Sequence, residues 1–492
     1  MPQHSVTATS AAGTVIGRVI GDALAFSGIP YGRAERFRKP EPAGRWSEPF
    51  DATAPGPRAI QGGEVDPEFG GIPTDLLRYF TGGTSAVAEP MNEDCQVLHI
   101  VTPAVDQAAR PVLVYIHGGG FDSGSAAPVL RSSRLAVEED VVVVGINHRL
   151  NVFGFLRLEE FPDASNAGLL DIVEGLRWVS TNIAAFGGDP ANVTLFGESG
   201  GGMKIGALLA MPTAKGLFHK AIIQSGSRLK AGDAEVSDAV SAALTSRLEK
   251  SAHELATMPA GELFDAWQSL GLSLAATVDD RWLPNPPFDP GAPETAADVP
   301  LIVGNTLDEF SLFLAFADDA TLAAMVPFDG EVRTRIEGAY EKDFPDVSHR
   351  QRLVRILSDI TFGNAAVLQG ERKAAQGAAV FRYVVAYSPS VADGAFGSFH
   401  GMDVPLLLRS LSKPELEPVA LAMGSAWAAF ARTGDPSTEE RVWPRFDADA
   451  RSTMIFDDES GVAENPYPNV RGVWAELPTT MSIRESLGNG VL

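Results

Sequence analysis

The sequence is poor in cysteine and in long apolar runs. Cys95 is the only cysteine among 492 residues, which excludes an intrachain disulfide and suits a reducing cytosol. No run of about 18 apolar residues occurs, so we expect no membrane span. The first residues show no basic region followed by an apolar run. We therefore expect no secretory signal and a cytoplasmic protein.

Basic residues are also scarce. The chain has 39 Lys and Arg against 63 Asp and Glu, a formal net charge of −24, which disfavours nucleic acid and anionic membranes as partners. Metal-ligand spacing is absent, because the lone cysteine has no companion and the eight histidines form no H-E-x-x-H pattern. We therefore expect no metal and no organic cofactor, and a chain that works as a monomer or a dimer.

Short apolar runs alternate with longer amphipathic segments. Segment 168–183, for example, places its apolar residues on one helical stripe. Strands that alternate with helices predict an α/β fold with a mostly parallel central sheet and helices on both faces. The runs that we predict as buried strands lie at 112–116, 141–146, 193–196, 221–223, 301–303 and 380–385.

Domain organisation follows from the motifs described below, which extend from Gly118 to His400. Length alone would suggest about three domains, but these motifs must converge on one site. We therefore interpret 1–492 as one elaborated domain. Helix-like patterns in roughly 227–298 and 306–360 predict cap insertions that roof the site.

A run of strand-forming residues from Val193 leads into Gly197-Glu198-Ser199-Gly200-Gly201, which fits G-x-S-x-G, and a small apolar helix follows. This strand–turn–helix context is what a nucleophile elbow requires. The turn is tight, and glycines tolerate its close backbone approaches. The pattern predicts that the Ser199 hydroxyl is exposed at the end of the strand.

A second glycine cluster follows the predicted strand at 112–116, in His117-Gly118-Gly119-Gly120-Phe121. Glycines after a strand can present backbone N–H groups to one point, which an acyl-transfer site needs for the negative charge of a tetrahedral intermediate. We expect an oxyanion hole made by Gly119, Gly120 and Gly200. A phosphate-binding loop is a poor alternative, because neither glycine-rich phosphate motif fits the spacing.

An acid and a histidine follow the serine. Asp308 and Glu309 come after the strand at 301–303, and His400 and Asp403 come after the strand at 380–385. The order serine, acid, histidine is that of α/β-hydrolases and differs from the orders of the two large serine-protease folds.

With these motifs the chain resembles the type-B carboxylesterase/lipase family, which includes bacterial para-nitrobenzyl esterases and animal cholinesterases. The resemblance covers nearly the whole chain and implies an α/β-hydrolase fold with Ser199 as nucleophile, Glu309 as acid and His400 as general base. Asp403 is the rival acid. Further motifs that carry the resemblance are Gly28-Ile29-Pro30-Tyr31, Glu93-Asp94-Cys95, Asn166-Ala167-Gly168-Leu169-Leu170-Asp171, Phe186-Gly187-Gly188-Asp189-Pro190, Gly216-Leu217-Phe218-His219-Lys220 and Gln224-Ser225-Gly226.

The chain departs from the family pattern close to these residues. Phe310 replaces a glycine after the acid, and Gly200 replaces an alanine after the nucleophile. Because only the N–H of residue 200 is needed, we expect function to survive there, and Gly200→Ala to leave activity within about tenfold. Lys204 stands where a small residue is usual, and we expect it to reach a carboxylate or water, or else to act as a cation that tunes leaving-group chemistry. Ala59 occupies the position of the cysteine that the family pairs with Cys95.

The resemblance implies hydrolysis of carboxylic esters through an acyl-enzyme. Phe121, Phe310, Leu312 and Phe313 are candidate pocket residues, or else ordinary core. As pocket residues they would favour small to medium apolar or aromatic esters. Stretch 62–89 has no tryptophan, which argues against choline esters. Two alternatives stay open: hydrolysis of aryl carbamates or anilides by the same triad, and a non-catalytic binding homologue.

Overall fold

The computed structural model describes residues 5–62, 76, 79–80, 89–314 and 317–477. Within this part of the chain, one large sheet has the strand order β1-β2-β3-β7-β9-β8-β10-β11-β12-β13-β14-β15, with β6 beside β2. A separate two-stranded sheet joins β4 (Gly32–Arg33) to β5 (Glu41–Pro42). The strands of the large sheet are β1 (Ser5–Ser10), β2 (Gly13–Ile20), β3 (Ala23–Pro30), β6 (Phe50–Asp51), β7 (Val97–Thr102), β8 (Arg110–Ile116), β9 (Val142–Ile146), β10 (Gly188–Glu198), β11 (Lys220–Gln224), β12 (Leu301–Thr306), β13 (Val380–Val385), β14 (Thr453–Phe456) and β15 (Gly461–Ala463).

The centre of the sheet, from β9 through β8 to β14, is parallel throughout. Antiparallel strands flank it on both sides. In β8, β9, β11, β12 and β13 every residue is buried, as expected for parallel strands that are covered on both faces. The predicted mostly parallel α/β sheet is therefore confirmed, and each predicted strand is present.

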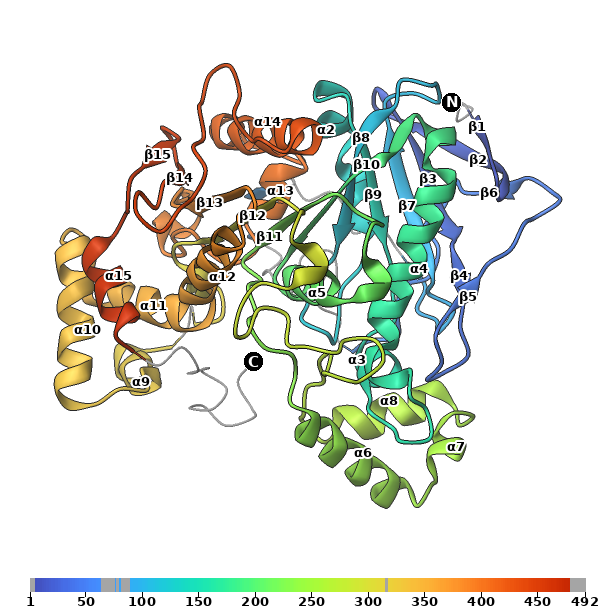
Figure 1. The fold of residues 1–492 in the computed structure, drawn as a ribbon, viewed down its shortest axis with the longest axis horizontal. Coiled ribbons are helices and arrows are strands. Elements are labelled where there is room, and N and C mark those ends of the chain that lie inside the picture. Colours follow the sequence, from blue (N-terminus) through green and yellow to red (C-terminus); the bar gives the residue numbers. More distant parts are fainter. Residues whose placement is uncertain (1–4, 63–75, 77–78, 81–88, 315–316, 478–492) are drawn as a thin grey trace.

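Helices cover both faces of the sheet (Figure 1). Val112 and Val114 of β8 belong to the hydrophobic cluster that includes Leu169 of α4. The alternate residues Leu113 and Tyr115 belong to a second cluster, built with α14 on the other face. This two-residue alternation divides one continuous apolar run between two cores. The helices are α2 (Ser133–Glu138), α3 (Asn151–Phe155), α4 (Ala167–Asn182), α5 (Gly200–Ala210), α6 (Ala234–Leu248), α7 (Ala252–Leu255), α8 (Ala260–Gln268), α9 (Asp319–Met325), α10 (Gly330–Asp343), α11 (His349–Ser358), α12 (Asn364–Ala375), α13 (Asp403–Leu407), α14 (Glu417–Thr433) and α15 (Pro468–Ala475).

The two segments predicted as cap insertions are both helical, but they pack differently. Val240 and Leu244 of α6 belong to the main core cluster with α4 and α5. Helices α9, α10 and α11 build a cluster of their own, which α15 completes with Val473 and Trp474. Figure 1 shows α9, α10 and α11 at the left of the molecule and α6, α7 and α8 at the bottom. Their role as a roof over the site stays a prediction.

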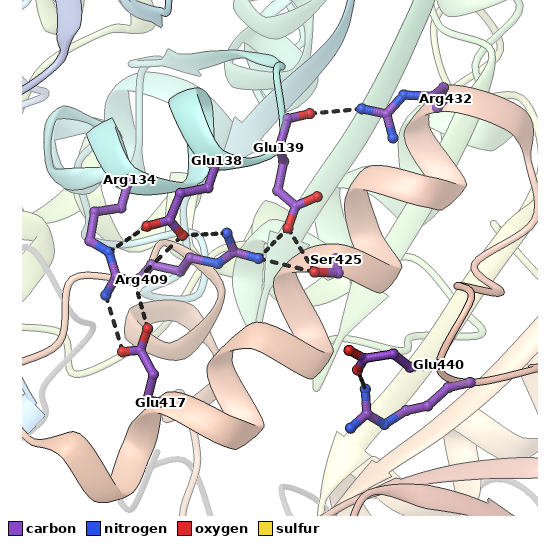
Figure 2. A network of polar contacts seen from close by, with 9 residues as sticks. Arg134, Glu138, Glu139, Arg409, Glu417, Ser425, Arg432 and Glu440 are labelled. Carbon is purple, nitrogen blue, oxygen red and sulfur yellow. Dashed lines mark hydrogen bonds and ion pairs between the residues drawn. The ribbon is translucent and has the colours of Figure 1, made fainter.

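Helices α2 and α14 are joined by a polar network (Figure 2). The buried guanidinium of Arg409 lies 2.6 Å from Glu138 Oε2 and also pairs with Glu139. Arg134 bridges Glu138 on its own helix to Glu417 at the start of α14, at 2.9 and 2.5 Å. A network with a buried arginine fixes two helices more strongly than isolated surface pairs do. No helix in the described part of the chain has the length and apolarity needed to cross a membrane.

Candidate active site

The elbow around Ser199 has the local strain that the motif predicts. Strand β10 ends at Glu198, α5 begins at Gly200, and Ser199 between them has φ 53° and ψ −123°. A positive φ is uncommon for a residue with a Cβ, so the surrounding structure must hold it. A Cβ on Gly201 would collide with the carbonyl oxygen of Ile116, which is why only glycine fits there. The Ser199 side of the turn is also tied to β11, because its N–H donates to Gln224 O at 2.8 Å.

Glu309 is the carboxylate at Nδ1 of His400. Its Oε2 lies 2.5 Å from that nitrogen, and its Oε1 accepts a hydrogen bond from Thr306 N at 2.8 Å. Glu309 is fully buried and begins a short 3₁₀ helix, Glu309–Ser311, with two residues between it and the end of β12. Both carboxylate oxygens therefore have fixed partners, and the imidazole is oriented by a group that cannot rotate away.

The two other candidate acids, Asp308 and Asp403, make their hydrogen bonds to groups other than His400. Asp308 accepts from Arg355 Nε at 2.9 Å and from Ser398 N at 3.0 Å, so it fixes the loop that carries His400. Asp403 accepts from Gln224 Nε2 at 2.8 Å and from Tyr383 OH at 3.0 Å. Neither carboxylate is bonded to His400 Nδ1.

Glu198 lies at the other nitrogen of the imidazole. Its Oε1 is 3.0 Å from His400 Nε2, and its side chain is buried. The sequence motifs do not single it out, because residue 198 is the variable position of G-x-S-x-G. A carboxylate at the end of a buried strand, beside the proposed nucleophile, was the available signal. In this arrangement the Ser199 hydroxyl makes no hydrogen bond to His400 among the described residues, and Nε2 faces Glu198 instead.

Burial and nearby charges shift the pKa values of His400 and Glu198. Burial lowers the pKa of His400, but Glu198, Glu309 and Asp403 together outweigh it and raise that pKa to about 9. Burial also raises the pKa of Glu198 to about 8, against the opposing effect of His400. We expect the two groups to titrate as a coupled pair, with His400 protonated near neutral pH.

Two of the predicted oxyanion glycines, Gly120 and Gly200, lie in direct contact next to Ser199. Gly119 and Gly120 have φ of 83° and 61°, in the left-handed region that favours glycine. A Cβ on Gly200 would lie only 2.5 Å from Gly120 N and 2.6 Å from Gly120 C, and would collide with Gly120 O. The loop and the start of α5 are thus in direct backbone contact. This contact argues against the expectation that alanine would be harmless at position 200.

Lys204, on α5, is fully buried. Its Nζ donates to Gly120 O at 2.8 Å and to His117 O at 3.2 Å. The predicted partner was a carboxylate or water, whereas these hydrogen bonds run to two backbone carbonyl groups. Its Nζ also lies 5.4 Å from the centre of the Phe121 ring.

Two aromatic rings flank His400. Phe313 lies 5.4 Å from the imidazole, centre to centre, and is 43% exposed, while buried Phe362 lies 4.7 Å away. No sequence motif marks Phe362, which lies in the π-helical segment Asp359–Gly363 between α11 and α12. Phe310 is 1% exposed and packs between the other two rings.

The remaining predicted pocket residues are core residues in this structure. Leu312 belongs to the cluster with α14, and Phe121 packs edge-on against Phe155 at 4.8 Å. The roles of Phe121, Phe310, Leu312 and Phe313 in substrate binding stay predictions. Most of stretch 62–89, whose lack of tryptophan bears on choline esters, lies outside the described residues.

Comparison with known proteins identifies the family. The model of the carboxylesterase family matches residues 3–474. The chain belongs to the carboxylesterase family. Para-nitrobenzyl esterase of Bacillus subtilis (strain 168) is 33% identical over 500 residues, which cover 95% of this chain and 98% of the relative. Phenmedipham hydrolase of Pseudarthrobacter oxydans is 33% identical over 487 residues, which cover 90% of this chain and 94% of the relative.

Solved structures of this carboxylesterase family agree with the fold. The Geobacillus stearothermophilus carboxylesterase EST55 matches with a TM-score of 0.81 and 32% identity, covering 95% of this chain and 99% of the other. A structure named PNB esterase matches with a TM-score of 0.79 and 31% identity over the same shares. The α/β-hydrolase fold, the family resemblance and the assignment as a carboxylic-ester hydrolase are confirmed.

Proposed function

We propose that this carboxylesterase cleaves its ester through an acyl-enzyme on Ser199, with His400 as general base and Glu309 as its orienting acid. The observation that carries the proposal is the buried Glu309–His400 pair, 2.5 Å from Oε2 to Nδ1, whose imidazole lies 3.0 Å from Glu198, the chain neighbour of a serine held at positive φ. A nucleophile, a base and a group that orients the base are the parts that covalent acyl transfer needs.

In the first half of the reaction, the Ser199 oxygen bonds to the ester carbonyl carbon while His400 Nε2 takes the hydroxyl proton. The carbonyl π electrons move onto oxygen, and the N–H groups of Gly119, Gly120 and Gly200 stabilise that oxyanion. The intermediate then re-forms its C=O bond and breaks the bond to the alcohol oxygen. His400 gives its proton to the leaving alcohol, and Glu309 stabilises the transient imidazolium without taking the proton.

In the second half, water replaces the alcohol. His400 takes a proton from water as its oxygen attacks the acyl carbon, and collapse of the second tetrahedral intermediate breaks the bond to Ser199. The proton returns to the serine oxygen and the carboxylic acid leaves. His400 must be unprotonated at Nε2 to start either half. The charge of Glu198, whose Oε1 lies 3.0 Å from that nitrogen, raises the pKa of His400 and so opposes the loss of this proton.

Small to medium apolar or aromatic esters fit the surroundings of His400. The rings of Phe313 and Phe362 lie within 5.4 Å of the imidazole, and the exposed ring of Phe313 offers apolar area to a substrate group. The names of two relatives, a para-nitrobenzyl esterase and a phenmedipham hydrolase, agree with a site that takes small molecules.

Cys95, a buried free cysteine packed with Ala59, supports a cytoplasmic location.

The decisive experiment is Ser199→Ala. We expect kcat on para-nitrophenyl acetate to fall by about 10⁴- to 10⁶-fold, because removal of a triad member leaves only binding and the oxyanion hole. A fluorophosphonate should label the wild-type chain at Ser199 and leave the variant unlabelled, as read by mass spectrometry of the peptide. Ser132→Ala, a buried serine at the start of α2, is the control and should keep its activity.

Turnover by folded Ser199→Ala at the wild-type rate would overturn the proposal. A fully folded wild type with no turnover on any ester, carbamate or anilide would favour a binding homologue. A panel of para-nitrophenyl esters of increasing acyl length, with aryl carbamates and anilides beside them, assigns the bond type.

A further inference from the structure

Two departures from the family pattern meet at one carbonyl group. Gly200 and Lys204 are one turn apart on α5, so their side-chain positions lie on the same face of the helix. A Cβ on Gly200 would collide with Gly120 O, and Lys204 Nζ donates a hydrogen bond to that same oxygen at 2.8 Å. Lys204 and the absence of a Cβ at Gly200 therefore both affect the contact between α5 and the oxyanion loop, which we define as residues 117–121.

The two hydrogen bonds of Lys204 enclose the part of the loop that matters for catalysis. The N–H groups of Gly119 and Gly120 belong to the peptide units 118–119 and 119–120. Lys204 binds the carbonyl of His117 at 3.2 Å and that of Gly120 at 2.8 Å, which are the peptide units just before and just after. Glycine has the freest backbone of any residue. A run of three glycines therefore needs external anchors to keep two N–H groups pointed at one place.

The interior of the protein holds Lys204 in this position. Burying an amino group is costly unless it is hydrogen-bonded, and Lys204 is fully buried. Burial lowers the pKa of Lys204 to about 7, and the carboxylate of Asp122 opposes this. The ammonium and the neutral amine both carry N–H donors, so the bonds to the loop survive in either state. At the start of the loop, His117 stacks on His148 at 4.4 Å, and burial, with Lys204 contributing, lowers the pKa of both, that of His117 to about 3.

We propose that Lys204 is a positioning residue for the oxyanion hole, and that Gly200 is glycine because the loop held by Lys204 leaves no room for a Cβ. The inference rests on the proposed acyl-enzyme mechanism. Lys204 does not touch the substrate. It fixes the peptide units on either side of two N–H donors, so that they are aligned before the oxyanion forms.

The first test is Lys204→Met, which keeps the length of the side chain and removes its donors. We expect kcat to fall by about 10- to 100-fold with KM changed by less than about threefold, because the two hydrogen bonds that it removes support the transition state rather than substrate binding. A trifluoromethyl ketone that adds to Ser199 should bind more weakly by a similar factor. Lys204→Gln, whose amide can still donate, should recover part of the loss and serves if the Met variant folds poorly.

The matched control is Lys373→Met. Lys373 on α12 is also fully buried and also donates to backbone carbonyl groups, those of Ala296 and Ala297, but it is not part of the proposed site. Its loss should lower Tm and leave kcat within about twofold. If Lys204→Met behaves like Lys373→Met, with a lower Tm and an unchanged kcat, Lys204 is only a structural lysine.

A double-mutant cycle tests the coupling of the two positions. Gly200→Ala alone should lower kcat by about 100-fold or more, since the added methyl group pushes the anchored loop away. In the Lys204→Ser background the loop is released, and the same change should cost at least about tenfold less. Strictly additive effects would overturn the inference while leaving the mechanism intact, whereas full activity of Ser199→Ala would overturn the mechanism itself.

Discussion

The two sides of Ser199 differ in the kind of polar group that they carry. On the oxyanion side, the polar groups are the backbone amides of three glycines, and one buried lysine binds two carbonyl groups of the oxyanion loop. On the side of His400, they are the carboxylates of Glu198, Glu309 and Asp403, gathered around one imidazole. The first side depends on shape, because a single methyl group at position 200 has no space. The second depends on protonation, because burial and mutual repulsion raise the pKa of Glu198 to about 8 and that of Asp403 to about 6.

This difference teaches which kind of change each side tolerates. Backbone donors are not titrated in water, and side-chain substitutions other than proline leave them in place, so such substitutions alter the oxyanion side by moving the loop. The carboxylate side keeps its geometry when Glu is replaced by Gln, and changes its charge. Substitutions of equal size should therefore act through pH on one side and through structure on the other.

The largest effect on the His400 side should come from Glu309→Gln. Gln keeps the shape of the Glu309 side chain, but its amide favours the wrong tautomer of the His400 imidazole. We therefore expect kcat/KM to fall by about 10⁴-fold. Steady-state kinetics on para-nitrophenyl acetate across the pH range would measure it. The control is Asp308→Asn, which weakens the buried pair with Arg355 at 2.9 Å and should lower Tm more than kcat. An equal loss of kcat in both folded variants would mean that Glu309 is not the acid.

An intermediate effect is expected for Glu198→Gln, and it should be seen in the pH profile. Activity needs neutral His400, whose pKa the carboxylates raise to about 9, so kcat/KM should rise with pH through that region. Removing the charge of Glu198 lowers the pKa of His400, and the rising limb should move to lower pH by about 1–3 units.

The control for this shift is Asp403→Asn, which removes a carboxylate that has less influence on His400 and should move the limb less. A limb that stays in place in Glu198→Gln would show that Glu198 does not control the base, despite the 3.0 Å between its Oε1 and Nε2.

The smallest effect concerns the aromatic wall, by which we mean the rings of Phe313 and Phe362 beside His400. Phe313 is 43% exposed beside His400, whereas Phe310 is 1% exposed within a hydrophobic cluster. Phe313→Ala should raise activity on hexanoate relative to acetate esters by about 3- to 10-fold, because it opens space next to the base. Phe310→Ala should instead cost about 3–5 kcal/mol of stability. Acyl chain-length profiles and thermal melts of both variants check this. A changed profile in Phe310→Ala alone would mean that Phe310, not Phe313, borders the substrate.

Much of the site could be predicted because its parts are local in sequence. A nucleophile elbow is a strand, a tight turn and a helix within about 15 residues, and its glycines are required by backbone contacts that any such turn makes. The choice of Glu309 over Asp308 was the less local prediction, and it rested on the family pattern. In the structure these neighbours point to different partners, His400 and Arg355.

The sequence by itself determined the elements: which runs form buried strands, where the glycine turns lie, and that serine, acid and histidine follow separate strands. Only the tertiary structure decided which groups meet across those turns. Glu198 faces His400 Nε2, the Phe362 ring lies tilted against the imidazole, and Lys204 binds the Gly120 carbonyl. The physical reason is that parallel strands bring their carboxyl ends to one edge of the sheet. Contacts there depend on strand order and helix packing, which no spacing along the chain records.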